Sequence, residues 1–128
     1  MKKKVLIITD GSGETAKMAA EIALALKGNK VSIKSASDFI GNDILPVDAF
    51  FLGCEKPKPE SFSYLEDMLK HINFAGRPCG IFTPGSDKAV KYLANLVHDC
   101  EAALNPDALT SSSKNKGRWV QKVISKSL

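Results

Sequence analysis

The chain has 128 residues, of which 44% are apolar and 25% are charged, and both values are ordinary for a globular protein. This length predicts a single domain over residues 1–128 with room for a sizeable core. No apolar run approaches the ~18 residues that cross a bilayer. The run after the N-terminal lysines is too short for a signal peptide, so we expect a cytoplasmic protein without membrane insertion.

The net charge of +4 is concentrated at the two ends of the chain. Lysines occupy positions 2–4, and every charged residue after Asp107 is basic: Lys114, Lys116, Arg118, Lys122 and Lys126. We interpret these residues as a solvated helix face and expect no nucleic acid as a partner. Neither interleaved aromatic residues nor a known nucleic-acid motif accompanies them.

Cysteines stand at three widely separated positions, Cys54, Cys79 and Cys100, without the spacing of a metal site. We expect reduced thiols that pack mostly as small core residues. No metal site is predicted. Catalysis by Cys54 would need a cation or base beside it. Lys56 is the candidate, but no further catalytic pattern follows, so we expect no catalytic residues.

Apolar patterning predicts five strands in chain order, with helices between them. Continuous runs at 5–8, 49–52 and 79–82 predict strands buried on both faces. The alternating stretch 31–34 predicts a half-exposed edge strand, and 100–104 is a weaker candidate.

Helical spacing of apolar residues predicts the connecting helices: 19–26, 65–72, 89–97 and 119–124, the last with Trp119 in the core. We expect Ser63 and Glu66 to form a capping box and Ser86 to cap the helix after it. Strands that alternate with helices imply parallel pairing through right-handed crossovers. The predicted fold class is therefore α/β, a three-layer, doubly wound, parallel five-stranded sheet.

Ligands of such sheets bind beyond the carboxyl ends of the strands, where three loops are expected. We call residues 9–15 the first loop, 53–59 the second loop and 83–87 the third loop. In the first loop Gly11 and Gly13 let the backbone curl closely, and Ser12 and Thr15 supply hydroxyls. A helix N-terminus attracts anions, so this loop predicts a phosphate site. The alternative is a capped strand–helix turn without a ligand.

The first loop resembles that of the flavodoxin family, roughly [ST]-x-[ST]-G-x-T, which wraps the phosphate of FMN. Residues 11–19 resemble the short flavodoxins' Gly-Thr-Gly-Asn-Thr and the helix behind it. Residues 52–54 and 80–86 correspond in position to the family's two flavin-flanking loops. The resemblance covers the chain in order and spacing. It implies a flavodoxin-like fold with strand order 2-1-3-4-5, FMN as cofactor, and electron transfer between redox proteins.

The resemblance also implies which residues bind the cofactor. The first loop would hold the phosphate, and the second and third would flank the flavin ring. The implied residues are Thr9, Asp10, Gly11, Ser12, Gly13, Glu14 and Thr15, then Gly53, Cys54, Glu55, Lys56 and Pro57, then Thr83, Pro84, Gly85, Ser86 and Asp87.

Asp10 departs from the family pattern, because flavodoxins often carry Ser or Thr there. Two unit charges 4 Å apart interact by roughly 4 kcal/mol at an effective dielectric of 20. The carboxylate must therefore point away, be neutralised or displace the phosphate. Glu14 replaces a frequent Asn, but an acid in the first turn of a helix is favourable.

The two flavin-flanking loops depart as well. Pro57 and Pro59 lack an N–H where the family has a peptide that flips, and Lys56 and Lys58 add positive charge. With a flavin bound, these cations predict a less negative reduction potential than is usual in the family. The third loop lacks the aromatic that stacks on the flavin, and we expect Phe62 and Tyr64 to serve packing.

Three functions remain open from the sequence. The first is an FMN-binding electron carrier, monomeric or weakly dimeric, whose basic surface implies an acidic redox partner. The second is a flavodoxin-fold binding or regulatory module with weak or no FMN binding. The third, a reductase that uses a nicotinamide, is less favoured because no second nucleotide site is evident.

Overall fold

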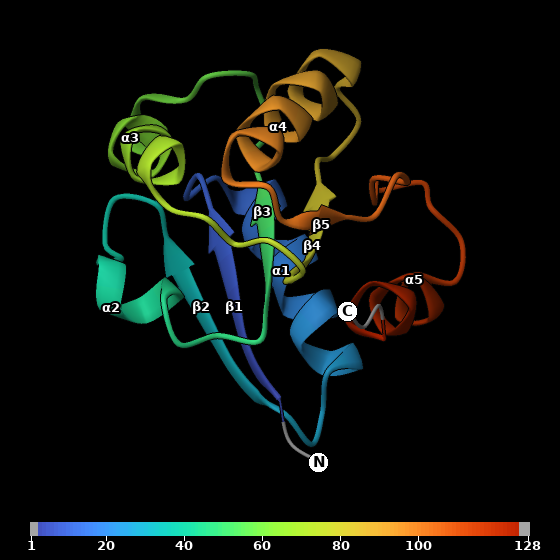
Figure 1. Cartoon of the computed structure of the whole chain (residues 1–128). Coiled ribbons are helices and arrows are strands. Elements are labelled where there is room, and N and C mark those ends of the chain that lie inside the picture. The colour runs from blue at the N-terminus through green and yellow to red at the C-terminus, as the bar shows by residue number, and fades with distance from the viewer. Residues whose placement is uncertain (1–2, 126–128) are drawn as a thin grey trace.

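The protein is described by a computed structural model over residues 3–125 (Figure 1), so Lys2 and Lys126 of the basic clusters lie outside the described residues. Its five parallel strands form one sheet in the order β2-β1-β3-β4-β5, which confirms the predicted topology. The strands are β1 (Lys4–Thr9), β2 (Lys30–Ser35), β3 (Ala49–Gly53), β4 (Pro78–Phe82) and β5 (Ala103–Leu104).

Helices cover both faces of the sheet, as Figure 1 shows, and complete the three layers. They are α1 (Gly13–Ala25), α2 (Gly41–Ile44), the 3-10 helix η1 (Glu60–Phe62), α3 (Ser63–His71), α4 (Asp87–Cys100) and α5 (Lys116–Ile124). Among the described residues no helix has the length and apolar character needed to cross a membrane.

The core divides into two clusters because side chains of a strand alternate between the faces of a sheet. Val5 and Ile7 of β1 pack with Phe51 of β3 under α1 and α5. Leu6 and Ile8 face the opposite side, under α3 and α4. Every residue of β3 and of β4 is buried, as the continuous apolar runs predicted. β2 is partly exposed at one edge, also as predicted.

The structure corrects several local predictions. The capping box of Ser63 with Glu66 is wrong, because η1 runs directly into α3. The Ser63 hydroxyl donates to the Glu60 carbonyl instead, and the Glu66 carboxylate accepts the hydroxyl of Tyr92. Trp119 is only half-buried.

The boundaries of the weaker elements also differ from those predicted. The fifth strand is only two residues long, because α4 continues through Cys100. The short helix α2 carries no apolar stripe of its own and was not predicted. Ser86 does cap α4, accepting the Ala89 N–H over 3.1 Å.

Candidate functional site at the carboxyl edge of the sheet

The first and second loops meet at this edge because β1 and β3 are neighbours in the sheet. The Glu55 N–H donates to Asp10 Oδ2 over 2.8 Å, and the Ser61 hydroxyl donates to the Asp10 carbonyl over 3.3 Å. The end of β4 joins the second loop, since the Cys54 N–H donates to the Phe82 carbonyl over 3.3 Å. The structure thus brings together the loops that follow β1 and β3, next to the end of β4.

The first loop turns the chain sharply from β1 into α1. Gly11 adopts φ +86°, a left-handed conformation that favours glycine. Ser12 is the N-cap of α1, and its hydroxyl accepts the Thr15 N–H over 3.4 Å. The backbone therefore has the curled form, capped by a hydroxyl, that the sequence predicted.

The Asp10 carboxylate occupies the inside of this turn. Its Oδ1 accepts the Ser12 N–H over 3.0 Å and the Thr15 hydroxyl over 2.5 Å, while Oδ2 accepts the Glu55 N–H. The bond from Ser12 is an Asx turn, a local geometry that Asp readily forms with the N–H two residues on. Two of the first loop's donors, the Ser12 N–H and the Thr15 hydroxyl, are therefore already bonded to an anion of the protein itself.

The ionisation of Asp10 matches this role as an internal anion. Burial by itself raises the pKa of Asp10, but hydrogen bonds from Thr15, Glu55 and Ser12 together outweigh it, so the pKa lies below its ordinary value. The group is charged at neutral pH. Within the described structure, the N–H groups of Gly13 and Glu14 in the first turn of α1 keep no acceptor.

Residues of the second loop divide between core and solvent. A Cβ placed on Gly53 would lie 2.1 Å from Cε2 of Phe82, so the core packing itself requires a glycine. Cys54 has no exposed surface, and burial together with the Asp10 charge raises the pKa of its thiol to about 12. Such a thiol is neutral and is a poor nucleophile. Glu55, Lys56 and Pro57 are exposed.

The third loop is held by the segment that follows β5. The Thr83 N–H donates to the Leu109 carbonyl over 3.0 Å, and the Ser111 N–H donates to the Pro84 carbonyl over 3.3 Å. The Thr83 side chain has no exposed surface, and its hydroxyl is without a hydrogen-bond partner in the described structure. Gly85 and Asp87 are exposed, and the Ser86 hydroxyl caps α4 by accepting the Ala89 N–H.

Nearby aromatic rings serve packing rather than the loop surface. Phe62 has no exposed surface, and its ring lies 6.1 Å from that of Tyr92. Tyr64 is half-exposed, and its ring packs 5.3 Å from that of Phe39. The three loops contain no aromatic residue of their own, so no ring in them can stack on a flavin.

The donor set of the first loop does not fit the phosphate of FMN in this arrangement. Of the three expected outcomes for Asp10, the structure has the carboxylate among the donors, where a phosphate oxygen would compete with it. Sequence reasoning missed Ser61, which anchors the Asp10 carbonyl. It also missed the Glu55 bond, because nothing local in the sequence links residues 45 positions apart.

Comparison with solved structures identifies the fold. No protein-family model matches the chain, and no curated protein matches its sequence. Among solved structures, oxidised flavodoxin 2 from Bacillus cereus is similar at a TM-score of 0.74, with 17% identity over 94% of both chains. A flavodoxin from Streptococcus pneumoniae is similar at a TM-score of 0.75, with 16% identity over 96% of this chain and 95% of that one.

A flavodoxin variant from Fusobacterium nucleatum, bound to flavin mononucleotide, is similar at a TM-score of 0.70. Its identity to this chain is 13%, over 98% of this chain and 95% of that one. Sheet order, helix placement and these matches agree along nearly the whole chain. This protein has the flavodoxin-like fold.

Proposed function

We propose that this protein is a flavodoxin-fold binding module that does not hold FMN through its phosphate, and that it acts by binding another protein or a smaller ligand. One observation carries the proposal: the Asp10 carboxylate accepts hydrogen bonds from Ser12, Thr15 and Glu55 inside the first loop. An anion that belongs to the chain thus accepts hydrogen bonds from donors of the loop that the resemblance assigns to a ligand phosphate.

The energetic argument supports the same function. A phosphomonoester carries about −1.5 to −2 charges near neutral pH. To admit it, the loop must either bear a repulsion of roughly 4 kcal/mol per pair of unit charges at 4 Å or release Asp10 from its hydrogen bonds. Hydrogen bonds to a charged group are worth about 1.5–3 kcal/mol each. Because the three loops contain no aromatic side chain, FMN would also lack about 1–3 kcal/mol of stacking on its flavin ring.

An FMN-binding electron carrier is the second candidate. Its support is the likeness to flavodoxins over nearly the whole chain, one of them bound to FMN, and the two amides of Gly13 and Glu14 that keep no acceptor in the described structure. In this candidate the first loop would hold the phosphate, the second and third loops would flank the ring, and an acidic redox protein would be the partner.

A flavin titration separates the two candidates. The purified chain is inspected for flavin absorbance, and FMN is then titrated with flavin fluorescence as the readout. The proposal expects a colourless protein and no saturation in the low micromolar range. Stoichiometric flavin in the purified protein, or a submicromolar Kd for added FMN, would overturn it and favour the second candidate. Riboflavin serves as the control ligand, because it lacks the phosphate.

A further inference from the structure

A groove beside α5 lies apart from the three loops. It has a volume of about 570 Å³, and its lining includes Asp107, Lys114, Arg118, Trp119 and Lys122. Arg118 and Lys122 stand one helical turn apart on α5, and Lys114 lies just before the helix. None of the groove's lining residues belongs to the first, second or third loop. This surface is therefore distinct from the candidate site at the carboxyl edge of the sheet.

Trp119 gives the groove a fixed aromatic wall. Its ring lies 5.6 Å from the ring of Phe51, and its Nε1 donates to the Asp107 carbonyl over 2.8 Å. A Cβ on Gly80 would come within 2.8 Å of the Trp119 ring, so the indole sits directly against β4. An aromatic side chain that is partly exposed and held on several sides offers apolar contact at little entropic cost.

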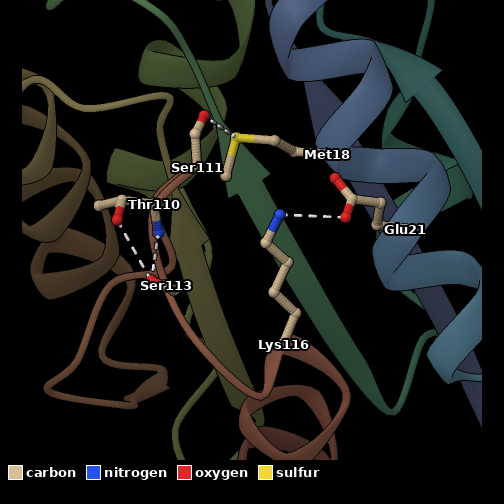
Figure 2. Close-up of polar contacts among 6 residues, drawn as sticks. All are labelled: Met18, Glu21, Thr110, Ser111, Ser113 and Lys116. Atoms are coloured by element: carbon tan, nitrogen blue, oxygen red, sulfur yellow. Dashed lines mark hydrogen bonds and ion pairs between the residues drawn. The ribbon is translucent and has the colours of Figure 1, made fainter.

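The cations of the groove are available for a partner. Lys116, also at the start of α5, is tied to Glu21 of α1 at 3.1 Å (Figure 2). That contact is the only ion pair among residues 3–125. Lys114, Arg118 and Lys122 are exposed, and within the same described range no carboxylate pairs with them. They therefore form a cluster of three cations beside a single acid, Asp107.

We propose that this groove docks an acidic, extended segment of a partner protein. Arg118 suits bidentate contact with a carboxylate, the two lysines add charge that steers an acidic chain, and Trp119 receives an apolar side chain of the segment. This inference rests on the proposed function, in the case where the ligand is another protein. It adds which surface binds that protein and that the bound segment is acidic.

The groove favours an acidic protein segment over a nucleic acid. Asp107 is one of the lining residues, and its like charge weighs more against a chain of phosphates, which is charged at every step, than against a peptide whose acids are separated by uncharged residues. Single-stranded nucleic acids also bind on several aromatic platforms, whereas this groove has one indole, already packed on one side.

The test uses the full chain and a synthetic peptide of roughly ten residues, with glutamates around a central leucine pair. Affinity is measured from the anisotropy of a fluorescein label on the peptide. Trp119 is the only tryptophan of the chain, so its fluorescence reports whether the peptide binds at the groove. We expect saturable binding that changes Trp119 emission and weakens steeply with added salt.

Two matched variants decide the outcome. The groove variant combines Lys114→Glu, Arg118→Glu and Lys122→Glu, and should weaken peptide binding at least tenfold. The control variant combines Lys70→Glu, Lys88→Glu and Lys91→Glu, which are exposed residues of α3 and α4 on the other face. It changes the net charge equally and should alter the affinity by less than threefold. Circular dichroism checks that both variants fold.

Equal weakening in both variants would overturn the proposal, because it would mean that net charge alone attracts the peptide. Unchanged affinity in the groove variant would overturn it as well. Tighter binding of a single-stranded DNA oligonucleotide of the same charge would assign the groove to nucleic acid instead. The flavin titration tests the first loop only, and the peptide titration tests the groove only. Tight FMN binding would therefore overturn the proposed function, whereas loss of the difference between the two variants would overturn the groove proposal.

Discussion

Asp10 and Glu55 join two loops that are 45 residues apart in the chain: the Glu55 N–H donates to Asp10 Oδ2 over 2.8 Å. The other carboxylate oxygen accepts from Ser12 and Thr15 within the first loop. One side chain thus ties the loop after β1 to the loop after β3. A loop whose donors are bonded to its own carboxylate has fewer free donors for a phosphate.

Replacing Asp10 by Ser should give the first loop affinity for phosphate. The substitution removes a charge that repels a phosphate by roughly 4 kcal/mol at 4 Å, and it frees the Ser12 N–H and the Thr15 hydroxyl. We expect Asp10→Ser to tighten FMN binding at least tenfold in a flavin fluorescence titration, with little change for riboflavin. Glu14→Ser is the matched control, because Glu14 is exposed in the same loop. Equal FMN affinity in Asp10→Ser and wild type would contradict the role given to the carboxylate.

Stability should depend on pH through Asp10. Its folded-state pKa lies below the ordinary value of 3.8, so the carboxylate stabilises the fold above that value and loses this contribution as the pH falls through the folded-state pKa. At pH 7 we expect Asp10→Asn to lower the free energy of unfolding by about 1–2 kcal/mol. Urea unfolding of wild type and variant at pH 7, 5 and 3 measures the difference, which should shrink toward acid. A difference independent of pH would contradict the prediction.

Gly53 should be required by the core. The Cβ of Gly53→Ala would lie 2.1 Å from Phe82 Cε2, and Phe82 has no exposed surface into which its ring can move. Overpacking of this kind costs typically 1–3 kcal/mol and occasionally more, so we expect a loss of about 3 kcal/mol in chemical unfolding. Gly13→Ala is the matched control, since nothing lies within 4 Å of its Cβ, and its effect should be slight. An unchanged free energy of unfolding in Gly53→Ala would contradict the prediction and would mean that the Phe82 ring moves to make room for the new Cβ.

Removing the Thr83 hydroxyl should stabilise the protein. The hydroxyl is buried and has no hydrogen-bond partner among residues 3–125, and a buried unsatisfied polar group costs about 1–3 kcal/mol. Thr83→Val keeps the shape of the side chain and should raise the free energy of unfolding by about 1 kcal/mol. Thr83→Ser, which keeps the hydroxyl and loses a methyl group, should lower it. A loss of stability in Thr83→Val would mean that the hydroxyl has a partner, such as an ordered water.

The strands and helices followed from the sequence because apolar periodicity reports burial directly, whereas the strand order was implied by the resemblance to flavodoxins. The runs 5–8, 49–52 and 79–82 are all buried on both faces in the sheet. Local chemistry was predicted where it depends on a few neighbouring residues, as in the Ser86 cap. The predicted capping box at Ser63 was wrong, because the Ser63 hydroxyl donates to the Glu60 carbonyl of the preceding 3-10 turn, and the Glu66 carboxylate accepts from the distant Tyr92.

The sequence by itself determined the parallel strands, the helices and the curled first loop, because these depend on patterning and on glycines near hydroxyl residues. The strand order was implied by the resemblance to flavodoxins. The sequence also defined the conflict between a phosphate and Asp10. Only the tertiary structure decided how the conflict is resolved, since the Glu55 amide reaches Asp10 through the pairing of β1 with β3. The groove at α5 likewise depends on packing, because Trp119 meets Asp107 and Phe51 only in the folded chain.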